Sequence, residues 1–140
     1  MKVWVLAYVT TLVVYLALDA TWLGLVAKQF YQSEIGNLMA AEPNLVAAAA
    51  FYLSYVVGVV VFVVRPALTR RSATRAILAG ALFGLLAYGT YDLTNLATLK
   101  GWTVTMTVVD MSWGLFATAF SAGVAYAVAR RLAARDDLWF

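Results

Sequence analysis

The sequence contains no cysteine and no histidine among its 140 residues. The lack of cysteine excludes disulfides, thiolate chemistry and sulfur-ligated metals. The lack of histidine removes the commonest general base, the usual zinc and copper ligand, and histidine ligation of haem. No glycine-rich phosphate loop and no G-x-S-x-G elbow is present. No cofactor is therefore predicted, and any chemistry must use carboxylates, hydroxyls, amides and aromatic rings.

Charge is also scarce, at 12% of residues, while 64% are hydrophobic and the mean hydropathy is +0.84. A soluble domain has about half apolar and a quarter charged residues. Because about 20 mostly apolar residues cross a bilayer, the sequence predicts an all-α integral membrane protein. We expect one domain over residues 1–140, built as an antiparallel four-transmembrane-helix bundle. The predicted helices are residues 3–24, 44–64, 76–97 and 103–128.

The basic residues predict the orientation of this bundle. Only Lys28 and Lys100 lie at one set of helix ends, and the other eight of the ten basic residues lie at the opposite set. Basic residues favour the cytoplasmic side of a membrane, so both termini are predicted to be cytoplasmic. The net charge of +3 then reflects the orientation of the helices in the membrane. The expected partner is therefore the lipid bilayer and not nucleic acid. The eight residues are Lys2, Arg65, Arg70, Arg71, Arg75, Arg130, Arg131 and Arg135.

Three local features of the sequence refine the prediction of the helices. Apolar side chains recur at near-helical spacing in residues 27–39, which predicts a short amphipathic helix on the outer surface between the first two spans. The alternative is a continuation of the first helix into the headgroups. Pro66, just after Arg65, is expected to end the second helix on the cytoplasmic side. Lys2 leads directly into a run of spanning length without a cleavage site, so we expect the first helix to be retained.

Three of the seven acidic residues, Asp19, Asp92 and Asp110, lie inside predicted spans. Each costs about 2.5–3.5 kcal/mol to insert near a helix centre. Counting 1.5 Å per residue along each predicted span places all three ~8–9 Å to the outer side of the bilayer centre. Helices that run in different directions therefore bring an acid to one level, and we infer that the three acids form one site.

The faces of the helices give the other members of this site. Residues three, four and seven apart share a helical face, which aligns the acids with aromatic, amide and small side chains. Small residues mark close helix packing in membranes, so Gly80 and Gly84 are predicted to lie at a tight helix contact. The polar stripe continues this packing face and should point into the bundle. The predicted ligand- or proton-binding residues are Asp19, Asp92, Asp110, Tyr15, Tyr88, Asn95, Trp22 and Trp113.

No lysine or arginine lies within a predicted span to neutralise these acids. Three outcomes remain: the acids are protonated and hydrogen-bonded, they share protons, or they bind a cation, which includes a hard metal ion at Asp19, Asp92 and Asp110. The alternative to a functional site is interhelical hydrogen bonding, usually worth about 0.6–2 kcal/mol. Three acids at one depth with aromatic neighbours favour the functional site.

The runs L-D-A-T-W-L-G (18–24), Y-D-L-T-N-L-A-T-L-K-G-W (91–102) and V-V-D-M-S-W-G (108–114) give the chain a family resemblance. In this order and spacing, the sequence resembles a bacterial family of small four-helix membrane proteins that is classed as a domain of unknown function. The resemblance implies a location in the bacterial inner membrane and a four-helix fold. It implies no catalytic residues, so the site rests on the residues themselves.

Three functions are compatible with these patterns. The leading hypothesis is a protein that binds or transports a proton, a cation or a small lipophilic ligand in a pocket in the outer half of the bundle. Four helices are few for a permeation path, so transport would require a homo-oligomer or a larger membrane-protein partner. One alternative is a membrane enzyme that uses aspartates for acid–base chemistry on a lipid or isoprenoid. The other is an assembly subunit whose aspartate-bearing faces point outward to a partner.

Overall fold

The computed structural model describes residues 2–135, and this part of the chain is helical apart from short turns and loops, with no strand. Four of its segments are long and apolar enough to cross a membrane: Lys2–Val26, Leu45–Thr69, Ala73–Thr98 and Val104–Ala134. The predicted four-span fold is therefore confirmed. The elements are α1 (Lys2–Thr21), η1 (Trp22–Val26), α2 (Lys28–Ile35), η2 (Gly36–Leu38), α3 (Leu45–Val59), η3 (Val60–Val64), α4 (Arg65–Thr69), α5 (Ala73–Thr98) and α6 (Val104–Arg135).

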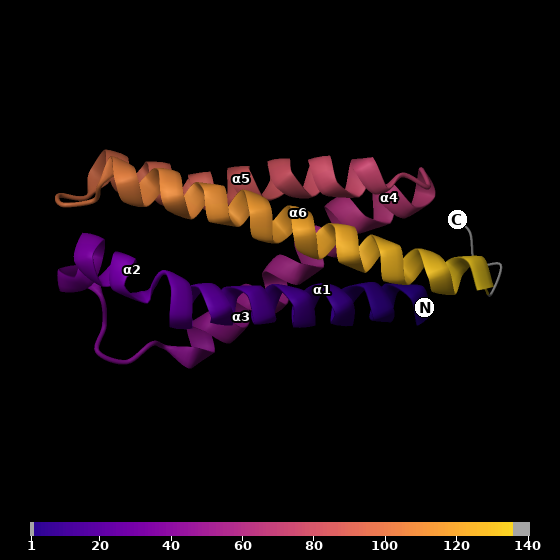
Figure 1. Cartoon of the computed structure of the whole chain (residues 1–140), viewed down its shortest axis with the longest axis horizontal. Helices are drawn as coiled ribbons and strands as arrows, with labels where there is room; N and C mark the ends of the chain where they lie inside the picture. The colour runs from indigo at the N-terminus through magenta and orange to yellow at the C-terminus, as the bar shows by residue number, and fades with distance from the viewer. Residues whose placement is uncertain (1, 136–140) are drawn as a thin grey trace.

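The four spans run antiparallel, and each end of the bundle has its own character (Figure 1). The short helix α2 and the turn between α5 and α6 lie together at one end, which we call the α2 end. The beginning of α1 and the turn between α4 and α5 lie at the other, the arginine end, which carries Arg70, Arg71 and Arg75. Helix α6 packs on both α1 and α5, and η3 packs on all three. Helix α3 crosses obliquely and packs on α1.

Glycines allow α5 and α6 to approach closely. A Cβ atom added at Gly84 would lie 2.2 Å from the carbonyl oxygen of Gly114, and one added at Gly80 would lie 3.0 Å from the Cα of Ala119. The first contact is closer than real Cβ atoms show, and the second is tighter than nine in ten real Cβ contacts. The predicted tight contact at Gly80 and Gly84 is confirmed, because only residues without a side chain let the two backbones meet at this distance.

Pro66 does not end the second span, contrary to the sequence prediction. The helix continues through η3, a π-helical turn, into α4, which ends at Thr69. A π turn shifts the backbone hydrogen-bond register by one residue. Pro66 then falls in the first turn of α4, where its missing N–H costs little. The second span is therefore longer than the predicted 44–64.

The predicted amphipathic helix between the first two spans is present as α2, and the structure shows what its apolar face contacts. Helix α1 ends in a second π turn, η1, and the chain then bends at Ala27. Tyr31 and Ile35 of α2 are buried against Trp102 and Met106, at the start of α6. The apolar face of α2 is thus packed on the protein, and α2 covers the end of the bundle (Figure 1).

Candidate functional site

Asp19 lies on the buried face of α1 and receives two hydrogen bonds. Its Oδ1 accepts one from the indole Nε1 of Trp113 on α6, 2.8 Å away, and its Oδ2 accepts one from the Tyr52 hydroxyl on α3. The side chain is 6% exposed. Both oxygens of Asp19 therefore have donors, and these come from two neighbouring helices.

Asp110 is held by the short helix α2. The Tyr31 hydroxyl donates a hydrogen bond to its Oδ1 and accepts one from the Trp22 indole Nε1 at 3.0 Å. The Trp22 ring stacks on that of Trp113, with centroids 4.4 Å apart and planes within 5°. Burial, followed by the hydrogen bond to Asp110, raises the pKa of Tyr31, so this phenol remains a donor. These contacts form a continuous chain from Asp110 to Trp113, which bonds Asp19.

Asp92 has a different environment from the other two acids. Its side chain is 0% exposed, and within residues 2–135 no hydrogen bond reaches either of its carboxyl oxygens. The side chain instead interacts with the carboxyl of Asp110. Two carboxylates are both acceptors, so they can form a hydrogen bond only if one of them carries a proton. One proton shared between Asp92 and Asp110 would satisfy this requirement.

A cavity of about 210 Å³ lies between α1, α2, α5 and α6 near the α2 end. Both Asp19 and Asp110 contribute to its wall, so the structure brings these two predicted residues to one space. Aromatic rings form much of the remaining wall, and no lysine or arginine lines it. Asp92 does not line the cavity and contacts Asp110 from within the core. The lining residues are Asp19, Leu23, Tyr31, Ile35, Tyr88, Tyr91, Met106, Asp110 and Trp113.

The remaining predicted residues have different positions. Tyr15 is fully buried and its hydroxyl bonds that of Tyr88, so it adjoins the cavity without lining it. Trp22 likewise supports the site from outside the wall, through its stacking on Trp113. Asn95 is half-buried, does not line the cavity, and makes no side-chain hydrogen bond in the described part of the chain.

Sequence reasoning missed three tyrosines of the site. Tyr52 lies on an apolar helix, three residues before Tyr55, and that shared face was the available signal. Tyr91 precedes Asp92 directly in the sequence, which made a shared face unexpected. Tyr31 was recognised only as part of an amphipathic segment, because its bond to Asp110 joins residues 79 positions apart.

A hard metal ion at the three acids is not supported by this geometry. Within residues 2–135 no cluster of three histidine, cysteine or acidic side chains is positioned to hold a metal ion. The oxygens of Asp19 already accept from Trp113 and Tyr52, and Asp92 lies off the cavity. The arrangement resembles an aromatic box with two acids more than a metal-ligand shell.

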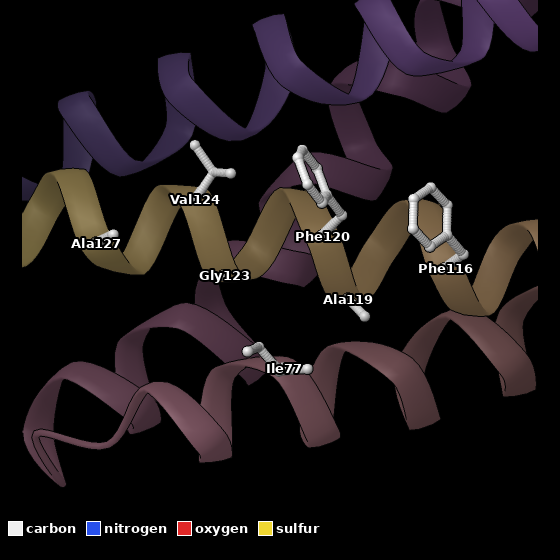
Figure 2. Close-up of a pocket in the computed structure, with 7 residues that line it drawn as sticks. All are labelled: Ile77, Phe116, Ala119, Phe120, Gly123, Val124 and Ala127. Atoms are coloured by element: carbon white, nitrogen blue, oxygen red, sulfur yellow. The ribbon is translucent and has the colours of Figure 1, made fainter.

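A second hollow, of about 420 Å³, differs in chemistry and offers no comparable site. Figure 2 shows that one side chain of α5 and several of α6 form it, and all of them are apolar or glycine. A groove of this kind on a membrane-spanning surface suits the acyl chains of surrounding lipid. Its residues are Ile77, Phe116, Ala119, Phe120, Gly123, Val124 and Ala127.

The four apolar spans and the acids enclosed among them define a multi-pass helical membrane protein. Residues 4–127 match the family described as "Predicted membrane protein (DUF2177)", and the chain belongs to this family. The match covers the second and third spans, most of the first and fourth, and every predicted site residue. Neither a curated protein nor a solved structure matches the chain.

Proposed function

We propose that the protein binds a small organic cation in the cavity at the α2 end, in exchange with the proton shared by Asp92 and Asp110. The observation that carries this proposal is a cavity lined by two acids and by aromatic rings, without a basic residue. On the predicted topology the α2 end is the outer side of the membrane, so the ligand would enter from outside the cytoplasm.

Charge favours a cation in this space. With one proton shared between Asp92 and Asp110, the pair keeps one negative charge, and Asp19 supplies another. Such charges are costly in a low-dielectric interior unless they are paired, so the site attracts a cation. Exchange of one monovalent cation for one proton leaves the net charge of the site unchanged. Tyr88, Tyr91 and Trp113 line the cavity, and a desolvated ammonium group over the face of such a ring gains cation–π attraction of about 0.5–2 kcal/mol.

The volume of the cavity favours a small ligand. A water molecule takes about 30 Å³ of liquid volume, so about 210 Å³ accommodates a small ammonium ion. It is smaller than the roughly 300–1,000 Å³ of ordinary drug-sized pockets and too small for an isoprenoid chain. The alternative of a lipid-modifying enzyme is therefore less well supported. The assembly-subunit alternative needs outward-facing acids, whereas Asp19, Asp92 and Asp110 are all buried within the single chain.

Titration of the purified protein with tetramethylammonium chloride tests this proposal, with tryptophan fluorescence as the signal, because Trp113 lines the cavity. Sodium chloride at equal ionic strength is the solvent control. We expect a saturable change that is weakened by acid, because protons compete for the carboxylates. Asp19→Asn should weaken binding at least about tenfold, or 1.4 kcal/mol, since it removes one charge and keeps the side-chain size.

The matched control is Glu42→Gln, which removes a negative charge from an exposed loop residue. This variant should bind as the unmodified protein does. The proposal is wrong if the unmodified protein gives no saturable response, or if Asp19→Asn binds the probe with unchanged affinity while its thermal unfolding remains normal.

A further inference from the structure

Buried hydroxyl groups continue from the aspartate cavity toward the arginine end. Tyr88 lines the cavity, and its hydroxyl bonds that of Tyr15. The Tyr15 ring packs on that of Tyr55, with centroids 5.3 Å apart. The Tyr55 hydroxyl in turn bonds the Thr118 Oγ1, 2.8 Å away. The first four groups of the row thus connect α5, α1, α3 and α6.

The row extends along α6 through two hydroxyls that lack partners. Ser121 is 0% exposed and Tyr126 is 1% exposed, and neither hydroxyl has a hydrogen-bond partner within the described residues. Ser121 is about 4.5 Å beyond Thr118 along the helix axis, and Tyr126 a further ~7.5 Å. The side chain of Tyr126 lines another cavity, of about 510 Å³, together with Arg130 and Arg131 of the arginine end.

The free-energy cost of burying these hydroxyls without partners argues against a role in packing alone. An unpartnered buried polar group costs about 1–3 kcal/mol, and phenylalanine or alanine would fill the same positions without that cost. Polar sites in protein interiors commonly hold water that completes their hydrogen bonds. A hydroxyl is both donor and acceptor. It can therefore take a proton on one side and release its own on the other without net change.

We propose that this hydroxyl row, with bridging water between Tyr15 and Tyr55 and beyond Thr118, conducts protons between the Asp92–Asp110 pair and the arginine end. The row is defined as Tyr88, Tyr15, Tyr55, Thr118, Ser121 and Tyr126. The inference rests on the proposed function for the presence of an exchangeable proton on the acid pair. It adds a second route: the cation enters at the α2 end, and the displaced proton leaves through the opposite half of the bundle.

Proton flux into liposomes tests the inference. Purified protein is reconstituted into vesicles that contain a trapped pH-sensitive dye, and a potassium gradient with valinomycin sets the membrane potential. The unmodified protein should acidify or alkalinise the lumen faster than protein-free vesicles. Tyr55→Phe and Thr118→Val each break the row by deleting one hydroxyl, and each should lower the protein-dependent rate at least about fivefold.

The matched control is Thr90→Val, which makes the same change at an exposed threonine bonded to the Leu86 carbonyl of its own helix at 2.8 Å. Its flux should equal that of the unmodified protein. Flux no faster than in protein-free vesicles, or an undiminished rate in both Tyr55→Phe and Thr118→Val, would overturn the hydroxyl row. Tetramethylammonium binding by the same preparations separates this failure from failure of the cavity, because neither Tyr55 nor Thr118 lines the cavity.

Discussion

Replacement of Gly84 by alanine should disrupt the contact that sets the cavity wall. The new Cβ would lie 2.2 Å from the Gly114 carbonyl oxygen and 2.6 Å from the Thr118 Oγ1, whereas ordinary contact begins at 3.4 Å. Neither α5 nor α6 can relieve a backbone clash of about 1.2 Å by a rotamer change. Overpacking of this kind costs about 1–3 kcal/mol. At roughly 4 °C per kcal/mol for a chain of this length, Tm should fall by about 4–12 °C.

The assay is thermal unfolding in detergent, followed by tryptophan fluorescence. Gly24→Ala is the matched control, because a Cβ atom there meets nothing within 4 Å, and its Tm should not decrease. Tetramethylammonium binding should weaken in Gly84→Ala, since Gly114 packs directly on the ring of Tyr88, which lines the cavity. Equal Tm values for the two variants would refute the close approach of α5 and α6.

Three further predictions follow from the fold and the site. A reporter active only outside the cell should be silent after Phe140 and active when inserted beside Lys100, and the reverse pattern would refute the orientation. Tyr31→Phe removes the donor to Asp110, so amide exchange in α2 should accelerate more than in α5; equal protection would contradict the role of Tyr31 in holding α2. Asp92→Asn should unfold within a few degrees of the unmodified protein, because the amide can donate to Asp110 in place of the shared proton. Asp92→Leu should be clearly less stable in the same assay, and equal stability of the two variants would argue against the paired carboxyls.

The spans were predictable because the membrane imposes a length and an apolar composition that can be read from the chain alone. The glycine contact was predictable for a related reason: Gly80 and Gly84 lie four residues apart, and that spacing places them on one face of α5. Both inferences depend on features that lie within one segment of the chain. The π turns could not be predicted in this way, and one of them, η3, accounts for the helix that continues past Pro66.

The acids were found in the sequence because charge is rare in an apolar span, but their partners were not. Asp19 is bonded by Tyr52 because α3 crosses obliquely and contacts α1, which periodicity within α3 does not encode. Tyr31 reaches Asp110 because η1 bends the chain and folds α2 back over the bundle. The differences among the three acids therefore depend on long-range packing, which a single sequence does not reveal.

Infrared spectroscopy of the carboxyl groups measures the proposed chemistry most directly. A protonated carboxylic acid has a C=O stretching band that a carboxylate lacks, and its intensity reports the number of protons held. At neutral pH the unmodified protein should show the band, Asp92→Asn should lose it, and tetramethylammonium should reduce it as the cation displaces the proton shared with Asp110. Absence of the band from the unmodified protein, or a band that neither Asp92→Asn nor the cation diminishes, would contradict a proton-exchanging aspartate site.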